Sequence, residues 1–383
     1  MTKITRLVTG GVDAHSDSHH AAALDERGQL LGDAAFATNL EGYHELLTWL
    51  DSFGQVGRVG VESTGSYAAG LARFLAARGI AVVEVNQPHA HSQRRRGKSD
   101  PLDAEAAARK VLAGEATASP KHTEGIVESI RQLRVAREGA VKANTAALNQ
   151  LYELVITAPD ELRQQLAARK TSRGKATLCL RLRPDRTRLH EPLQAAKLAL
   201  RSIAERIREL DRQIGLLDRH LAQLVATAAP RTTSLLGVST QNAGQLLVTA
   251  GQNIERLPTN GAFARLCGAS PIPASSGRTN RHRLNRGGDR QANRALHLIA
   301  VCRLRYCPRT RAYASRRTAE GLTKPEIIRC LKRYIARELY HTLQADLADL
   351  SPSTPPARHI ATINCGAGPI STTRTRRRSR NRT

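Results

Sequence analysis

A seven-residue apolar repeat runs through the middle of the chain and restricts it to long, paired helices. The repeat is unbroken through Leu200, Ile203, Ile207, Leu210, Ile214, Leu217, Leu221 and Leu224. Steps of three and four residues bring these side chains onto one stripe of a helix, which is the seam of a coiled coil. An earlier stretch has the same spacing at Ile126, Ile130, Leu133, Ala140, Ala147, Leu151 and Leu154, with Arg137 and Asn144 at seam positions. Polar seam residues commonly fix register and partner, so we expect a hairpin within the chain, pairing between chains, or both.

Residues 159–192 link the two stretches and would form the tip of such a hairpin. Their sequence is densely basic, with ARKTSRGKATLCLRLRPDRTRLH at its centre. A basic tip suits the backbone of a guide RNA or of DNA, because Lys and Arg neutralise phosphates.

The N-terminal segment has the pattern of an α/β domain. Three strands are expected within residues 6–38, then a helix at 42–53, a strand at 58–63, a helix at 66–78 and a strand at 80–86. Three antiparallel strands followed by alternating helix and strand is the order of a ribonuclease-H-like (RuvC-like) fold. The predicted fold class is therefore α/β plus all-α: this domain, a helical coiled-coil middle and a mostly helical C-terminal domain.

Carboxylates fall at informative places in that order. Asp13 lies near the end of the first strand and Glu62 at the end of the fourth, while Asp100 and Asp103 open a helix. Carboxylates brought together repel one another unless cations neutralise them, so the set predicts Mg²⁺ or Mn²⁺. Two such ions roughly 3.5–4 Å apart serve phosphodiester chemistry in other proteins. The alternative for the last two is helix capping, with Asp100 at the N-cap and Pro101 at the first helical position.

The charge of the chain points to a polyanionic partner. Lys and Arg number 59 against 33 Asp and Glu, which gives a formal charge of +26 and a pI near 10.9. Nucleic acid is the favoured partner, and an anionic membrane surface is the competitor. Aromatic residues make up only 3% of the chain, so arginine–phosphate contacts are expected to dominate over base stacking.

The six cysteines show no metal-binding spacing. No apolar run is long enough to span a bilayer, and no signal-peptide core is present, so we expect a soluble, cytoplasmic, nucleoid-associated bacterial protein.

A second candidate for chemistry is the stretch from Leu266 to Arg294. Adjacent serines, Ser275 and Ser276, precede Gly277, and Pro271 and Pro273 stiffen the approach. The basic residues that follow are Arg278, Arg281, Arg283, Arg286, Arg290 and Arg294. A serine hydroxyl among guanidinium groups suits attack on a phosphodiester, because arginines bind phosphate oxygens and spread developing charge. The alternative is a Ser/Gly turn in an ordinary basic loop.

Two blocks of motifs, taken together, resemble a known family. GVDAH, VEST, NQPHAHSQRRRGKSDPLDAEAAAR and GASPIPASSGR, in this order, resemble the insertion-sequence transposases that join a DEDD (RuvC-like) domain to a serine-bearing transposase domain. Pilin-gene DNA invertases and recombinases guided by a bridge RNA belong to the same group. The resemblance covers roughly residues 5 to 345.

The resemblance implies site residues and partners. It places the DEDD set on Asp13, Glu62, Asp100 and Asp103, and the serine nucleophile on Ser276, with Ser275 as the alternative one position away. Implied partners are DNA (element ends and target) and a structured guide RNA, and we expect a homo-oligomer, a dimer or tetramer. The basic loop before Asp100 is expected to contact nucleic acid through Arg94, Arg95, Arg96 and Lys98.

The C-terminal half carries three further predictions. Residues 234–251 are typical of a helix-hairpin-helix-like unit, in which a turn at Gly237 binds phosphate, or of an ordinary packing unit. The last predicted helix begins at Lys324. It should bury Ile327, Ile328, Leu331, Tyr334 and Ile335 and leave Lys332, Arg333 and Arg337 outward. Residues 351–383 lack periodicity and end in RTRRRSRNRT, so we expect a disordered basic tail.

Together these features predict four parts and one leading function. The parts are a DEDD domain at 1–118, a coiled-coil domain at 119–229, a serine-bearing domain at 230–350 and the tail at 351–383. The leading function is a DNA transposase or site-specific recombinase. The alternatives are a metal-dependent junction resolvase, in which the serine loop is structural, and a non-catalytic nucleic-acid-binding protein.

Overall fold

The computed structural model of the chain describes residues 6–85, 99–278 and 282–350. Three sets of sequence predictions lie outside these ranges: the basic-loop residues Arg94, Arg95, Arg96 and Lys98, the loop residue Arg281, and the tail at 351–383.

The N-terminal domain is built on a five-stranded mixed sheet of order β3-β2-β1-β4-β5. Its elements are β1 (Leu7–Ala14), β2 (Ser18–Leu24), β3 (Leu30–Ala37), α1 (Leu40–Phe53), β4 (Gln55–Glu62), α2 (Ala69–Ala77), β5 (Ala81–Val85) and α4 (Asp100–Leu112). β1 pairs antiparallel with β2, and β2 with β3, whereas β1–β4 and β4–β5 are parallel. The predicted ribonuclease-H-like arrangement is confirmed.

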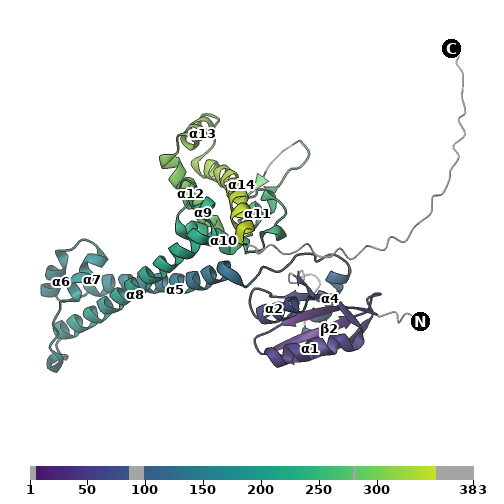
Figure 1. Ribbon diagram of the computed structural model, residues 1–383. Coiled ribbons are helices and arrows are strands. Elements are labelled where there is room, and N and C mark those ends of the chain that lie inside the picture. The colour runs from purple at the N-terminus through teal and green to yellow at the C-terminus, as the bar shows by residue number, and fades with distance from the viewer. Residues whose placement is uncertain (1–5, 86–98, 279–281, 351–383) are drawn as a thin grey trace, which may run out of the picture. The chain divides into compact units, whose positions relative to one another are not determined.

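The two faces of this sheet carry different helices (Figure 1). Side chains alternate along a strand, so Val8 and Val12 of β1 point to one face, where they share a core with Leu46 of α1 and Leu71 of α2. The opposite face, which includes Val85 of β5, packs against the alanine-rich stripe of α4. Odd-numbered residues of β1 therefore point to the face that α4 covers.

The predicted coiled coil is a hairpin within the chain. Its two long helices, α5 (Gly125–Ile156) and α8 (Pro192–Ala228), pack along each other (Figure 1). The polar seam residues of α5 have partners on α8: Arg137 Nε lies 2.5 Å from Asp218 Oδ1, and Asn144 Nδ2 donates to Asp211 Oδ1 at 3.0 Å. These pairs fix the hairpin register, while pairing between chains remains a prediction.

The tip of the hairpin is a small folded unit and not an open basic loop. It contains α6 (Asp160–Ala167), α7 (Ser172–Cys179) and a short 3₁₀ turn, η1 (Arg186–Arg188). Leu162, Leu166 and Cys179 are buried against the ends of the long helices, and burial raises the pKa of the Cys179 thiol to about 11. The basic side chains of the tip are therefore displayed on an ordered support.

The C-terminal region is helical apart from one short hairpin. Its elements are α9 (Pro230–Thr233), α10 (Thr240–Ala250), η2 (Ile254–Arg256), α11 (Asn260–Leu266), β6 (Ile272–Pro273), β7 (His282–Arg283), α12 (Arg290–Tyr306), α13 (Pro308–Ala319) and α14 (Lys324–Leu350). Ile130 and Leu221 from the base of the long hairpin share its hydrophobic core. Among the residues described, no helix is both long and apolar enough to cross a membrane.

The predicted outer face of α14 is partly wrong. Ile327, Ile328, Leu331 and Ile335 are buried as expected, but Tyr334 is 59% exposed and Lys332 only 9%. Lys332 points inward because its Nζ donates to Asn293 Oδ1 of α12 at 2.8 Å.

The turn at Gly237, predicted either to bind phosphate or to serve packing, lies against α12. A Cβ on Gly237 would meet the backbone and a side chain of α12 at 3.3 Å, which supports the packing alternative.

Candidate active site

Two of the predicted carboxylates sit where neighbouring parallel strands end. Asp13 lies near the end of β1 and Glu62 closes β4, and both are almost fully buried, at 7% and 6% exposed. Gly11 and Gly60, two residues earlier in each strand, face α4 directly. Because side chains two apart on a strand share a face, Asp13 and Glu62 also belong to the face under α4.

Glycine lets α4 approach this face closely. A Cβ on Gly11 would lie 2.2 Å from the Ala104 carbonyl oxygen and 2.3 Å from the Ala108 nitrogen. Such distances are far below van der Waals contact, so only a residue without a side chain fits. The close packing places the first turn of α4 beside the ends of β1 and β4.

The first turn of α4 brings the other two carboxylates. Asp103 is 8% exposed and continues the buried stripe of Ala107 and Val111, whereas the side chain of Asp100 is 52% exposed. The capping role considered for Asp100 is wrong, because Ser99 is the N-cap and Asp100 already lies within the helix. Both aspartates lie near the positive end of the helix dipole, where negative charge is stabilising.

A histidine that the sequence analysis did not single out completes the group. His15 Nε2 lies 3.2 Å from Asp13 Oδ2 and 3.4 Å from Asp100 Oδ1. Ligand atoms of these three residues all fall within 4.8 Å of one another. Strand alternation could have predicted this position, because His15 follows Asp13 by two residues and so points to the same face of the sheet.

The donor set fits a divalent cation. Carboxylate oxygens are ligands that Mg²⁺ and Mn²⁺ accept in proteins, and an imidazole nitrogen suits transition-metal ions. Among the described residues, Asp13, His15 and Asp100 form the group with metal-compatible spacing, and Glu62 and Asp103 lie outside it.

The backbone after Glu62 is under conformational constraint. Ser63 has φ of +56°, and it is the one non-glycine residue with positive φ in the described ranges. The next residue, Thr64, is buried and donates to Glu84 Oε1 at 3.1 Å. Left-handed non-glycine residues gather at functional sites, where the surrounding structure holds them in place.

The serine stretch forms an exposed hairpin on the C-terminal region. β6 pairs antiparallel with β7, Ile272 opposite Arg283 and Pro273 opposite His282. Ser275 and Ser276 lie in the connection and are exposed, and Gly277 has φ of +53° with open space around it.

The base of this hairpin is held more tightly than its end. Asn293 Nδ2 donates to the carbonyl oxygens of Cys267 and Gly268 at 2.9 and 3.0 Å. Asp289 caps α12 by accepting from Gln291 N and Ala292 N, and its second oxygen accepts from Thr249 of α10 at 2.5 Å. The two ends of the loop are therefore held by hydrogen bonds that involve α10 and α12.

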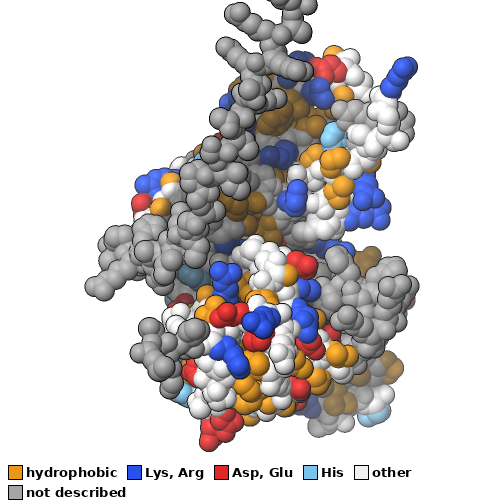
Figure 2. Space-filling model, turned by 90° about the vertical axis from the view of Figure 1, so that its right-hand side faces the viewer, with side chains coloured by type: hydrophobic (Ala, Val, Ile, Leu, Met, Phe, Trp, Pro, Cys, Tyr) orange, Lys and Arg blue, Asp and Glu red, His pale blue; other side chains and the backbone are white. Residues whose placement is uncertain are grey.

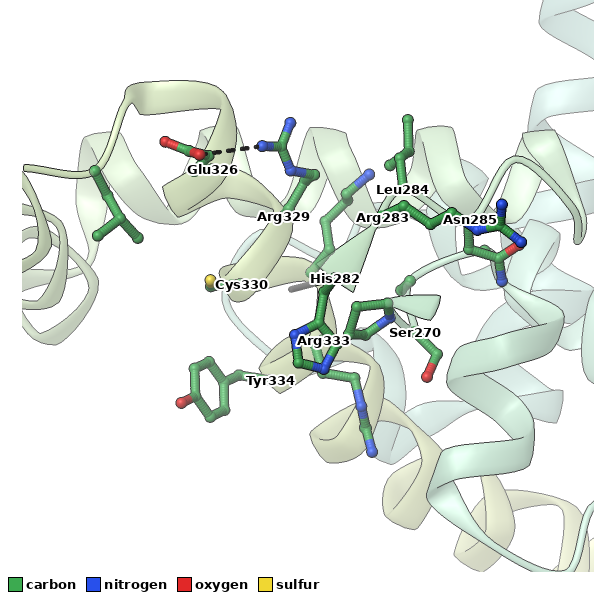
Figure 3. Close-up of a pocket in the computed structure, with 15 residues that line it drawn as sticks. Ser270, His282, Arg283, Leu284, Asn285, Glu326, Arg329, Cys330, Arg333 and Tyr334 are labelled. Carbon is green, nitrogen blue, oxygen red and sulfur yellow. Dashed lines mark ion pairs between the residues drawn. The ribbon is translucent and has the colours of Figure 1, made fainter. Parts of the chain in front are cut away.

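A cavity of about 580 Å³ lies beside the base of the hairpin (Figure 3). It is bounded by segments 268–271 and 282–285 and by the first turns of α14. Its basic lining residues are His282, Arg283, Arg329, Lys332 and Arg333. Burial, and then the charge of Arg329, lowers the pKa of Lys332. Glu326 also lines the cavity and pairs with Arg329 at 3.8 Å (Figure 3). The basic residues still outnumber this one carboxylate, so the cavity favours an anionic group.

The predicted nucleic-acid-binding arginines that the structure describes are accessible. Arg278, Arg283, Arg286 and Arg290 are all exposed. In Figure 2 the N-terminal domain shows Asp and Glu side chains interspersed with Lys and Arg, while the C-terminal region shows mainly Lys and Arg. The four arginines are therefore open to contact with phosphates.

Comparison with known proteins places both candidate sites in one family. Residues 10–157 match a family described as a DEDD transposase of the IS110 group, and residues 229–315 match "Transposase IS116/IS110/IS902 family". The chain belongs to the IS110 family of transposases. The first match contains Asp13, Glu62, Asp100 and Asp103, and the second contains Ser276, so the resemblance seen in the motifs is confirmed.

Two relatives align with the chain. The 43.6 kDa protein of insertion element IS110 from Streptomyces coelicolor is 34% identical over 149 residues, which is 38% of this chain and 35% of the relative. The 42 kDa protein of insertion element IS900 from Mycobacterium paratuberculosis is 23% identical over 397 aligned positions, covering 91% of this chain and 98% of the relative. The chain thus spans about a third of the first relative and nearly all of the second.

Proposed function

We propose that this protein is a DNA transposase that cuts and exchanges strands with a cation-binding carboxylate site and a serine nucleophile. The observation that carries the proposal is the convergence of Asp13 and Asp100, with His15, on the sheet face covered by α4. Glu62 and Asp103, buried at the same edge, complete the DEDD set. Family membership supports DNA as the substrate.

Asp13, Asp100 and the neighbouring carboxylates would hold the cation. A bound Mg²⁺ or Mn²⁺ would supply charge neutralisation at the reacting phosphate. Asp13 and Glu62 are held by hydrogen-bonded strands, so their positions change little when substrate arrives. Placement on rigid elements keeps such groups near productive geometry without reorganisation.

Ser276 is the proposed nucleophile. Its hydroxyl oxygen bonds to phosphorus, the bond from phosphorus to a bridging DNA oxygen breaks, and the departing DNA hydroxyl takes up a proton. Arg278 and Arg283, exposed on either side of the loop, and Arg281, outside the described residues, would bind the phosphate oxygens. Arginine does not readily accept a proton, so the base must come from elsewhere, and the carboxylate site of the same or another subunit is the natural source.

Guide RNA and subunit assembly extend this proposal. The ordered tip, with Arg181, Arg183 and Arg186 among its exposed basic residues, offers phosphate-binding groups away from both candidate sites in sequence. A structured guide RNA is the proposed occupant. Extraction of RNA that co-purifies with the protein, with and without the tip arginines replaced by Gln, tests this point.

The test of the main proposal is a cleavage assay on DNA that carries the element ends. Strand cleavage should require Mg²⁺ or Mn²⁺, stop in EDTA, and leave DNA covalently attached to protein on a denaturing gel. Equal cleavage in EDTA and Mg²⁺ would contradict the carboxylate site.

A metal-dependent junction resolvase is the second candidate. The observation in its favour is that Asp13, His15 and Asp100, all from the N-terminal domain, supply ligands for a cation. Metal-dependent cleavage of junctions with no covalent adduct would select this function.

A further inference from the structure

His15 is held in place by the turn that joins β1 to β2. Its backbone N–H donates to the Ser18 carbonyl oxygen at 3.0 Å, and its own carbonyl oxygen accepts from Thr38 Oγ1 at 3.4 Å. The imidazole is half-exposed, at 45%, while Asp13 beneath it is buried. The histidine therefore sits at the mouth of the carboxylate site, on a backbone anchored to two strands.

The spacing of the three donors suits one cation. Neighbouring ligands of an octahedral ion with bonds of about 2.1 Å are about 3.0 Å apart. His15 Nε2 lies 3.2 Å from Asp13 Oδ2 and 3.4 Å from Asp100 Oδ1, so small side-chain rotations meet that requirement. The donors come from a strand, a turn and a helix, so they come together only when the domain is folded.

We propose that His15 is a ligand of the divalent cation bound by Asp13 and Asp100, and that its nitrogen gives this site a preference for Mn²⁺ over Mg²⁺. The inference rests on the proposed function, since it concerns the same carboxylate site. Mg²⁺ favours oxygen ligands and surrenders its water reluctantly, whereas imidazole suits transition-metal ions. Replacing one oxygen donor by nitrogen therefore weakens Mg²⁺ relative to Mn²⁺.

The competing arrangement is a histidine that only balances charge. In that case protonated His15 pairs with Asp13 and Asp100 and moves aside when a cation enters. The two arrangements differ in one measurable respect, namely whether a histidine nitrogen is bonded to the bound ion.

Pulsed electron paramagnetic resonance of the full chain loaded with Mn²⁺ separates them. We expect a nitrogen coupling typical of a directly bound imidazole in the wild-type protein, replaced by the ¹⁵N pattern after ¹⁵N-histidine labelling. The His15→Gln variant should lose the coupling. Its Mn²⁺ dissociation constant should rise about tenfold or more, at least the loss seen when an outer-shell partner of a metal ligand is removed. The dissociation constant for Mg²⁺ should change less.

His20→Gln is the matched control. His20 lies opposite Asp13 in the sheet register and bonds Asp33 at 2.7 Å, outside the group of three. This variant should keep both the coupling and the affinity, and thermal melting of both variants checks that each is folded.

Each remaining outcome has a distinct meaning. Mn²⁺ bound without nitrogen coupling, or a coupling that survives in folded His15→Gln, would overturn the role of His15 and leave the carboxylate site standing. No Mn²⁺ binding by the wild-type protein would instead overturn the cation site of the proposed function.

Discussion

Asp13 and Ser276, the residues proposed for the two halves of the chemistry, are held by the fold in opposite ways. Asp13 lies in a strand paired on both sides and covered by α4. Ser276 lies in an exposed connection between strands of two residues each, above a firmly held base. Under the proposed function, the carboxylates would be in place before DNA arrives, whereas the serine hydroxyl would be fixed by bound DNA or by a second protein surface. The variants below test that difference.

Replacing the nucleophile should have the largest effect. Ser276→Ala removes the oxygen that bonds to phosphorus, so strand exchange should fall by a factor of about 10³ or more, with DNA binding retained. Ser275→Ala, the neighbouring control, should be milder. Denaturing gels and mass spectrometry of the trapped adduct measure both. DNA attached at Ser275 would move the assignment by one residue, and full recombination by the double variant would favour the resolvase.

Neutralising the buried carboxylates should stop cleavage without unfolding the domain. Asp13→Asn or Glu62→Gln removes a charge needed for cation binding but preserves side-chain shape, so we expect cleavage to fall by about 10³. Glu105→Gln is the matched control, because Glu105, on the neighbouring helix α4, is paired with Arg109 at 2.5 Å. Thermal melting and a cleavage assay decide the matter. Wild-type cleavage rates in either buried variant would remove the carboxylates from the chemistry.

Glycine substitutions compare the rigidity of the two regions directly. Gly11→Ala places a Cβ 2.2 Å from the backbone of α4, and overpacking of this kind costs about 1–3 kcal/mol or more. Gly277→Ala meets no atom within 4 Å and carries only the cost of left-handed φ, about 1–2 kcal/mol, in an exposed loop that can open locally. Denaturant midpoints should drop clearly for the first variant and little for the second. Equal midpoints would mean that α4 does not depend on close approach at Gly11.

The fold of the N-terminal domain could be predicted because its signals are local. Strand alternation, turn residues and element order specify the sheet, and the strand ends identify Asp13 and Glu62. His15 was missed although it obeys the same alternation, because a histidine beside a turn has many ordinary roles. The contact between His15 and Asp100 depends on how closely α4 packs on the sheet. Gly11 and Gly60 allow a close approach, but the sequence does not give its distance.

The C-terminal region was harder to predict because its partners come from distant segments. Lys332 lies on the buried stripe of α14, between Ile328 and Ile335, but its charge suggested an outward position, which the hydrogen bond to Asn293 makes unnecessary. Tyr334 is exposed where a buried ring was expected. The tip of the long hairpin shows the same limit. Its basic composition indicated a tip that binds phosphates but not its fold, in which a few leucines and Cys179 build a core with the long helices.

The smallest predicted effect concerns how each region meets DNA. If the exposed hairpin arginines bind phosphates, Arg283→Gln should weaken binding to all sequences alike and lower the slope of log affinity against log salt by about 1, because one fewer counterion is released. Arg109→Gln on α4 should leave the slope unchanged, since Arg109 is already paired with Glu105. Binding titrations at several salt concentrations measure both slopes. Equal losses would mean that phosphate binding extends over the N-terminal domain, and a loss confined to one DNA sequence would mean that Arg283 reads bases. Either result would contradict the proposed division between a buried site that holds the cation and an exposed hairpin that holds the strand.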